Sequence, residues 1–457
     1  MEKKKSKTNL LQKFADKFKK KKRAKSTSAS RERSSEMSRR PARQRSPSKA
    51  KKSGGTPSAS AESKSKIDLM EVTAKGIRAS KKEPKKEKKE KAKEKEKEKE
   101  FVTPTKTSST LTLRRADSQM ELSQNSKIVE KTMKTWMETL EKLDFKKTME
   151  SDFSSIDSTK VDPEKCHAFK KNIDSCQSDN LEVLDANRVK GNGESDFFYH
   201  GSVLNLTPIT TKSTILAQLA DTDSPQSLES FWLMVAGQKI QRVYALMDEG
   251  TTELTDTTKD IYFPPDFVEF KTIRVNNRNI VKSTDDQPNT QMYYEVVPKD
   301  CAEAPFCMIE ICDFWPDAKM PLKQSGRVAA TAATVFETDI DADASCAIIS
   351  HYGAGRAGSF LVGALAIEKL RNGEQPNMKD IAQMVRSQRP GAIETLPQYI
   401  FTYIIALYFG VKHVKDNGLK TRISAFIGSL ETFGSAKMLE GDEDESDETG
   451  TNSNTLE

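Results

Sequence analysis

Aromatic residues are scarce in this chain of 457 residues, and the scarcity is greatest toward the N-terminus. Between Phe18 and residue 127 the sequence consists largely of Lys, Arg, Glu and Ser, with almost no aromatic side chain. Such a segment cannot bury enough apolar surface to offset the entropy that folding costs. We therefore expect residues 1–127 to be a disordered, basic, low-complexity arm. One folded domain at 128–434 and an acidic disordered tail at 435–457 are expected to follow.

Long apolar runs are also missing. The longest run in the folded part, residues 399–411, is shorter than the roughly 20 residues that a membrane-spanning helix needs, and we expect it to be a core helix. No signal peptide is recognisable. The six cysteines and four histidines show neither a paired metal-ligand spacing nor a secretory disulfide framework. We predict an intracellular protein, cytoplasmic or nuclear, with reduced thiols, no metal and no cofactor.

The formal charge of +7 combines a strongly basic arm with an acidic tail. Leu10, Phe14 and Phe18 recur at helical spacing beside lysines, a pattern typical of weak contact with an anionic membrane or a helix-binding groove. Residues 19–23 also resemble a nuclear address, and the Arg- and Ser-rich residues 31–52 allow contact with nucleic acid or phosphorylation. A solvated arm without a partner is the remaining alternative, and all of these stay open.

Residues 348–360, IISHYGAGRAGSF, lead from a β-branched run into a glycine-rich turn with one arginine. Backbone N–H groups in such a turn, followed by an arginine at the mouth of a helix, surround a phosphate dianion. Four further segments stand around this turn in a consistent order. They are NLEVLDANRV at 180–189, SFWLMV at 230–235, FWPD at 314–317, and RSQRPG at 386–391 continuing as ETLPQYIF at 394–401.

In these segments the sequence resembles the classical protein tyrosine phosphatases, over about residues 128–434. The resemblance implies an α/β fold in which a strongly twisted mixed β-sheet is flanked by helices, with the phosphate loop between a central strand and a helix. It also implies covalent catalysis. A cysteine thiolate attacks phosphorus, an acid protonates the leaving oxygen, and a positioned water hydrolyses the cysteinyl phosphate.

Ser350 stands where the resemblance places the nucleophilic cysteine. A serine hydroxyl stays protonated at neutral pH unless a base adjoins it, whereas a thiol among N–H dipoles beside an arginine ionises. Cys346 lies four residues back on the incoming strand, about 13 Å away at ~3.3 Å per residue, so we expect a buried structural thiol. The family's histidine before the nucleophile is Ile349 here, and its hydroxyl residue after the arginine is Ala357.

The resemblance assigns the other site positions one by one. Asp317 holds the general-acid position, and Gln398 keeps one of the two places that position the attacking water. Glu394 replaces a glutamine at the other place, where its carboxylate would repel a phosphate dianion. The phosphate-binding residues would be Ser350, His351, Tyr352, Gly353, Ala354, Gly355 and Arg356.

By register, the resemblance places the family's substrate-recognition stretch at residues 175–178, which we call the recognition segment. By register Ser178 takes the position of a tyrosine that stacks on the substrate ring, a loss of roughly 0.5–1.5 kcal/mol of ring contact. The alternative is that Lys171 and Asn172 belong to the same recognition motif, displaced by an insertion. Before this region, apolar residues recur at helical intervals over 127–150 and predict a helix packed on the domain.

Two functions follow from these residues. The first is a catalytically inactive phosphatase-like protein that binds a tyrosine-phosphorylated protein or another protein partner, as a scaffold or regulator in signal transduction. The alternative is a weakly active phosphatase that dephosphorylates phosphotyrosine proteins. Beneath both lies a vestigial pocket, in which Arg356 pairs with Glu394 or another carboxylate.

Overall fold

The computed structural model describes residues 109–191, 197–248, 255–284, 288–299, 304–316, 319–337 and 344–447. Asp317 lies outside the described residues, as do the first 108 residues and those after 447. The expectations for the basic arm, for the end of the acidic tail and for the general acid therefore stay predictions.

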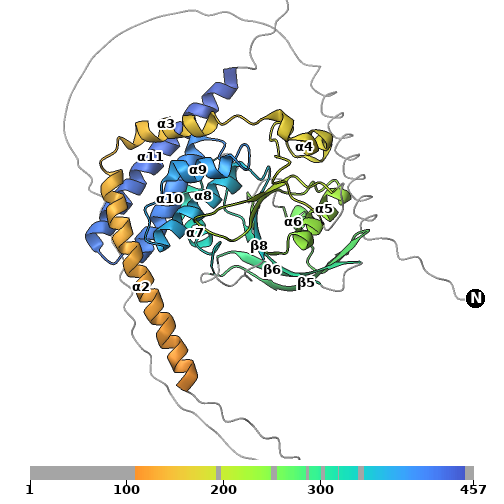
Figure 1. The fold of residues 1–457 in the computed structure, drawn as a ribbon, viewed down its shortest axis with the longest axis horizontal. Coiled ribbons are helices and arrows are strands. Elements are labelled where there is room, and N and C mark those ends of the chain that lie inside the picture. Colours follow the sequence, from red (N-terminus) through yellow and green to blue (C-terminus); the bar gives the residue numbers. More distant parts are fainter. Residues whose placement is uncertain are drawn as a thin grey trace, which may run out of the picture. The chain divides into compact units, whose positions relative to one another are not determined.

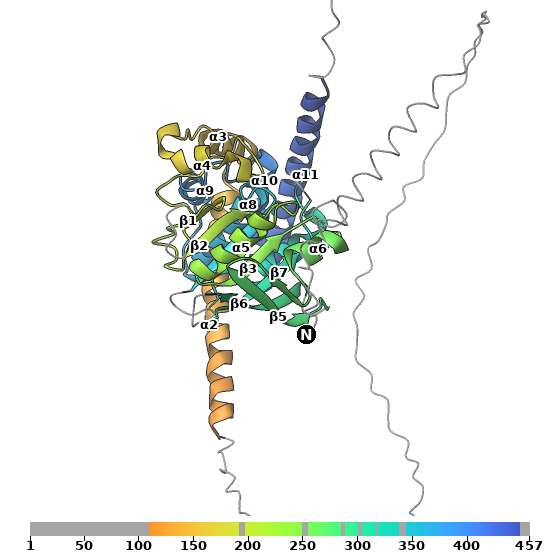
Figure 2. The same ribbon diagram turned by 90° about the vertical axis from the view of Figure 1, so that its right-hand side faces the viewer.

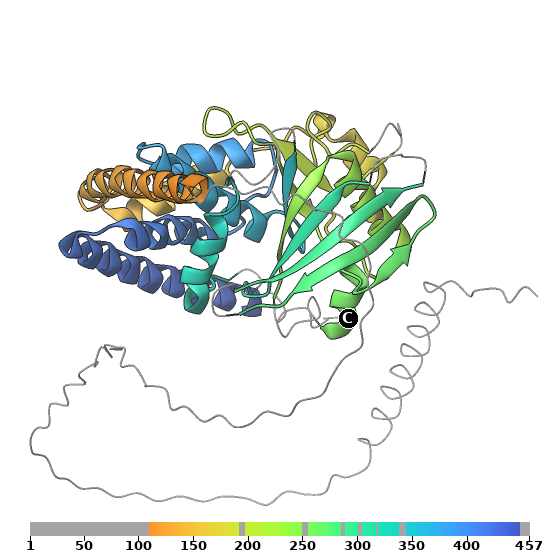
Figure 3. The same cartoon turned by 90° about the horizontal axis from the view of Figure 1, so that it is seen from below.

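The strands form one mixed sheet in the order β1-β2-β8-β3-β7-β6-β5-β4 (Figure 1). Strands β2, β8, β3 and β7 run parallel at its centre, and antiparallel pairs continue it on both sides. The twisted mixed sheet flanked by helices confirms the predicted fold class (Figure 3). The strands are β1 Gly201–Leu204, β2 Thr214–Gln218, β3 Ile240–Leu246, β4 Phe267–Glu269, β5 Ile273–Val281, β6 Thr290–Pro298, β7 Phe306–Cys312 and β8 Ser345–Ser350.

Helices pack on both faces of the central strands (Figure 2). Residues of α2, α3 and α7 to α11 build the core on one face, and α5 and α6 contribute to the core on the other. The helices are α2 Ser109–Leu140, α3 Phe145–Asp157, α4 His167–Lys171, α5 Pro225–Gly237, α6 Asp256–Tyr262, α7 Ser325–Ala332, α8 Gly355–Arg371, α9 Met378–Arg386, α10 Leu396–His413 and α11 Asn417–Asp447. Short 3-10 turns are η1 Pro163–Lys165, η2 Ile173–Ser175 and η3 Leu322–Gln324.

The sequence of β8 is apolar without interruption because the strand is covered on both faces. Cys346 and Ile348 belong to the core on the face of α8, whereas Ala347 and Ile349 belong to the opposite core. A parallel strand covered on both faces needs apolar residues at successive positions rather than in alternation. The predicted strands at 347–349 and 307–311 are confirmed, and Cys346 is buried as expected.

The apolar stripe at 127–150 forms two helices rather than one. Helix α2 ends at Leu140, and α3 begins at Phe145 after Asp144, whose side chain accepts the N–H of Lys147. The stripe is buried through Leu140, but Leu143 is 44% exposed in the turn. The apolar pattern of α2 ends at this turn. Asp144 then caps α3 by accepting an N–H of its first turn.

The expected domain limits both fall inside helices. Helix α2 begins at Ser109, ahead of the expected limit at 127, and α11 continues to Asp447, beyond the limit at 434. Neither extension has the apolar periodicity by which a packed helix is recognised in sequence. The run 399–411 lies in the buried helix α10, as predicted. Among the described residues, no helix has the length and apolarity needed to cross a bilayer.

Candidate functional site

Ser350 is the last residue of β8 and pairs with Gln218 at the end of β2. It is 2% exposed, and its Oγ accepts the N–H of Gly353 at 3.2 Å. Its carbonyl oxygen accepts the N–H of Leu219 at 2.8 Å. Among the described residues, no carboxylate or imidazole is hydrogen-bonded to the Ser350 hydroxyl.

The turn after Ser350 depends on a glycine. Gly353 has φ +64°, and a Cβ at this position would lie 2.1 Å from the carbonyl carbon of Ala217. The turn therefore passes directly against β2, in a conformation that side-chain-bearing residues rarely adopt. Helix α8 begins two residues later, at Gly355. The side chain of Ala354, the residue at its N-cap, makes no capping hydrogen bond.

Arg356 lies in the first turn of α8 and is 3% exposed. Its Nη1 donates to the carbonyl oxygen of Trp315 at 3.1 Å. Trp315 is fully buried, and its Nε1 donates to the carbonyl oxygen of Lys319 at 3.1 Å. The arginine is thus hydrogen-bonded to the segment that contains the expected general acid, although Asp317 itself lies outside the described residues.

A second arginine, Arg389, is hydrogen-bonded to the carbonyl groups of the turn. Arg389 is completely buried; its Nε donates to the carbonyl oxygen of Gly353 at 2.9 Å and its Nη2 to that of Tyr352 at 2.8 Å. Its Nη2 also lies 3.2 Å from Nδ1 of His200. The planar guanidinium presents several donors in fixed directions, which suits a turn whose carbonyl groups point toward it.

His200 is the partner of Arg389 and is 1% exposed. Burial, together with the charge of Arg389, lowers the pKa of His200 to about 3. The imidazole is therefore neutral at pH 7. Its Nε2 lies 2.7 Å from the carbonyl oxygen of Leu181 and carries the proton, which leaves Nδ1 to accept from Arg389.

Glu394 and Gln398 face the first residue of α8. A Cβ on Gly355 would lie 2.1 Å from Oε2 of Glu394 and 2.8 Å from both amide atoms of Gln398. Gln398 is 1% exposed, and its Oε1 accepts the N–H of Glu394 at 2.8 Å. Its Nε2 has no hydrogen-bond partner among the described residues. A carboxylate and an unused amide donor thus adjoin the start of the helix.

The family model of the protein-tyrosine phosphatases matches residues 172–408, a little more than half of the chain. The chain belongs to this family. A Caenorhabditis elegans protein named "Putative tyrosine-protein phosphatase B0280.11" is 63% identical over 448 residues, which cover 97% of this chain and 99% of the relative. Another from the same species, "Putative tyrosine-protein phosphatase C15H7.3", is 21% identical over 54% of this chain and 59% of the relative.

Solved phosphatase structures share the fold. The protein tyrosine phosphatase TcPTP1 of Trypanosoma cruzi aligns with a TM-score of 0.51 at 16% identity, covering 62% of this chain and 95% of that one. TbPTP1 of Trypanosoma brucei aligns with a TM-score of 0.50 at 14% identity, covering 60% and 95%. At identities this low, the structural similarity shows a common fold, and the chemistry has to be judged from the residues of the site.

The recognition segment of this phosphatase-family domain is tied to the end of β2. The N–H of Gln177 donates to Oε1 of Gln218 at 2.9 Å, and Nε2 of Gln218 donates to the carbonyl oxygen of Ser175 at 3.0 Å. Since Gln218 pairs with Ser350, the segment is one strand away from the phosphate turn. Ser178, at the predicted stacking position, is half-buried and its Oγ accepts the N–H of Asn180.

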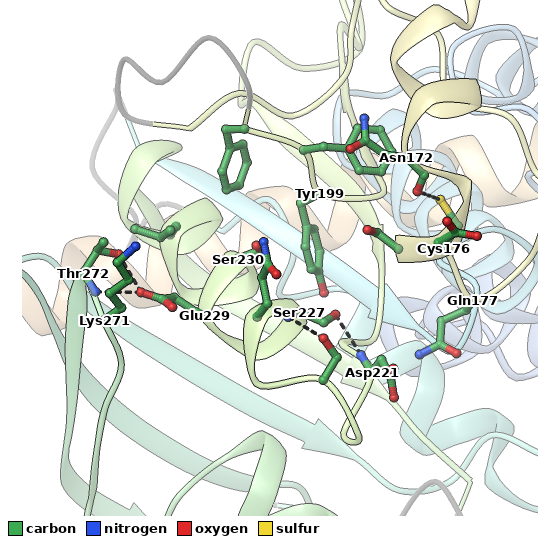
Figure 4. A pocket seen from close by; sticks show the side chains of 17 residues that line it. Asn172, Cys176, Gln177, Tyr199, Asp221, Ser227, Glu229, Ser230, Lys271 and Thr272 are labelled. Carbon is green, nitrogen blue, oxygen red and sulfur yellow. Dashed lines mark hydrogen bonds between the residues drawn. The ribbon is translucent and has the colours of Figure 1, made fainter. Parts of the chain in front are cut away.

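A cavity of about 430 Å³ adjoins the recognition segment on its other side. Figure 4 shows Asn172 and Gln177 across the cavity from Glu229 and Thr272. Oε1 of Glu229 accepts both the N–H and the hydroxyl of Thr272 at 2.7 Å. Most of the lining side chains carry hydroxyl, amide or carboxylate groups, so the cavity suits a polar ligand.

The sequence predicts part of this site. Ser350, Arg356, Glu394 and Gln398 gather around the start of α8, whereas Asn172 lines the neighbouring cavity. It assigned no role to Arg389 or His200. Arg389 lies in the segment RSQRPG at 386–391, but an arginine before a proline carries no sequence signal of burial. His200 belongs to none of the motifs.

Proposed function

We propose that this chain is a catalytically inactive member of the phosphatase family, which acts in signalling by binding a protein partner. The observation that carries the proposal is the environment of Ser350. A hydroxyl attacks phosphorus only when a base removes its proton, and N–H dipoles that suffice for a thiol do not ionise an alcohol. Within the described residues, the hydroxyl accepts the Gly353 N–H and is hydrogen-bonded to no carboxylate or imidazole.

Two neighbouring positions support the same conclusion. Ile349, at the position of the family's histidine, is buried in the sheet core, and Ala357, at the position of its hydroxyl residue, is a buried residue of α8. Both side chains are apolar and take part in packing rather than proton transfer. The groups that serve thiolate chemistry have been replaced together, which is expected of a domain kept for binding.

The catalytic part of the proposal is tested with the full chain and a phosphotyrosyl peptide, by phosphate release. We expect no turnover above that of the S350A variant, in which the hydroxyl is removed and the fold is kept. An active family member assayed in parallel establishes that release is detected. Turnover by the wild-type chain that S350A loses would overturn the proposal in favour of a weak phosphatase.

The cavity beside the recognition segment supports binding of a polar protein segment. Ser230 lines this cavity, so the S230R variant places a long charged side chain in it. We expect S230R to weaken the affinity for a partner purified with the wild-type chain by at least about tenfold, or ~1.4 kcal/mol. The control S429R is at an exposed position of α11, outside this cavity. Equal affinities of S230R and S429R, measured by titration calorimetry, would remove the cavity from the proposal.

A further inference from the structure

The Glu394 carboxylate lies at the turn 350–356 and the start of α8, which together we call the cradle. Oε2 of Glu394 would be 2.1 Å from a Cβ on Gly355, so the carboxylate lies against the backbone where α8 begins. Only a glycine leaves room for it there. The start of a helix has unsatisfied N–H groups and a positive partial charge, which favour an anion.

Nearby cations favour the same placement of the carboxylate. Burial lowers the pKa of Arg389 to about 10, and the Glu394 carboxylate acts in the opposite direction. The pKa of Arg386 is also lowered by burial, with Asp157 and Glu394 acting in the opposite direction. Glu394 therefore interacts electrostatically with two arginines as well as with the helix N-terminus. A phosphate dianion at this position would compete with the Glu394 carboxylate for the two arginines and the helix N-terminus.

The backbone directs Glu394 inward. Ile393 has φ +62°, a conformation that is costly for a β-branched residue and persists only where its surroundings impose it. Arg386 supplies that constraint, since its Nη1 donates to the carbonyl oxygens of Ala392 and Ile393. On the other side, Gln398 accepts the N–H of Glu394. The carboxylate is thus held at the cradle by the main chain.

Gln398 gives an independent indication of a ligand. Its Nε2 is buried, has no partner among the described residues, and lies beside the same Gly355 position as the Glu394 carboxylate. Buried amide donors are nearly always satisfied, and an unused one marks a place for an acceptor atom. An oxyanion at the start of α8 supplies that acceptor when the Glu394 carboxylate does not occupy the position.

We infer that Glu394 is the residue that sets the ligand class of the cradle. Its carboxylate occupies the anion position and excludes dianionic phosphate monoesters, whereas a neutral side chain at 394 admits them to Arg356, Gln398 and the helix N-terminus. The inference rests on the proposed function, because it explains how an inactive domain binds a partner without retaining phosphotyrosine at its cradle. It differs from that function in concerning binding of phosphate rather than turnover.

The experiment is titration calorimetry of the full-length chain with inorganic phosphate and with O-phosphotyrosine at constant ionic strength. The variants are wild type, E394Q, and E138Q, which removes one negative charge from an exposed position on α2. We expect E394Q to bind both ligands at least about tenfold more tightly than wild type, and E138Q to bind like wild type. Equal binding by all three proteins would overturn the inference.

A further variant separates exclusion from a structural role. E394D keeps the charge but draws it back by one methylene group, so we expect phosphate affinity between those of wild type and E394Q. Thermal melting of each variant reports its fold. Unfolding of both E394Q and E394D would show that the carboxylate is a structural requirement and would overturn the inference. Phosphate release by wild type, measured separately, bears on the proposed function and leaves this comparison intact.

Discussion

At the scale of single residues, the main finding is that the turn is supported by buried polar groups rather than by apolar packing alone. Arg389 is hydrogen-bonded to two carbonyl oxygens of the turn and approaches His200 from the same side. A buried guanidinium is tolerated only where hydrogen bonds replace those it makes to water. The neutral imidazole of His200 contributes one such bond without adding a second positive charge.

The low pKa of His200 predicts a pH dependence of stability. The unfolded chain takes up this proton near pH 6.5, whereas the folded chain resists it until about pH 3. The unfolded state therefore binds more protons between these values, and stability is lost as the pH falls below about 6.5. The unfolding free energy should fall by up to ~1.4 kcal/mol per pH unit from this group.

Urea denaturation at pH 7.5, 6.0 and 5.0 measures this effect. The H200N variant has no titrating imidazole at this position and should lose that part of the slope. H167N removes an exposed imidazole and should keep the slope of wild type. Identical pH profiles for wild type and H200N would show that His200 does not stay neutral in the folded chain.

At the scale of elements, the connection from β8 to α8 positions the whole site. The turn brings Ser350 and Arg356 together because Gly353 allows the chain to reverse against β2. Parallel strands end at the same edge of a sheet, so Gln218 and the recognition segment arrive there as well. The site thus depends on one strand-to-helix connection and its neighbouring strand.

Substitution of Gly353 tests this dependence. G353A places a Cβ 2.1 Å from the carbonyl carbon of Ala217 and forces a left-handed φ on alanine. We expect a loss of more than about 2 kcal/mol in unfolding free energy. G428A is the matched control, since a Cβ there meets nothing within 4 Å in helix α11, and it should raise stability by roughly 0.5–1 kcal/mol. Similar urea midpoints for the two variants would contradict the role of the turn.

At the scale of the folded domain, helix α2 belongs to the core that supports the site. Met133 and Trp136 are buried with residues of α8 and α10, and the Trp136 ring stacks on that of Tyr403 at a centroid distance of 6.3 Å. Helix α10 in turn carries Gln398. Segments before the region matched by the family model therefore stabilise the elements of the site.

The contribution of α2 is measured by truncating its largest side chain. W136A should cost about 3–5 kcal/mol of unfolding free energy, because it removes a buried aromatic ring and leaves a cavity. K134A, on the exposed side of the same helix, should change it by less than about 0.5 kcal/mol. A loss below about 1 kcal/mol in W136A, from urea denaturation, would show that α2 packs on the domain without stabilising it.

Features that depend on neighbouring residues follow from the sequence alone. The apolar run of β8, the glycine turn with Ser350 and Arg356, and the buried helix at 399–411 are all local patterns, since spacing along the chain dictates backbone conformation and which side chains face inward. The sequence did not predict that α2 and α3 are separate helices, or that α2 and α11 extend beyond the expected domain, because long polar helical segments carry no apolar period.

How distant residues meet at the site follows from tertiary packing. Arg389 and His200 are 189 positions apart, and Glu394 reaches Gly355 through the packing of α10 beside α8. Such contacts depend on how elements pack, and packing is set by the shape and burial of all their side chains together rather than by any one motif. The contacts of Arg389 and His200, and the approach of Glu394 to Gly355, are therefore visible only in the folded chain.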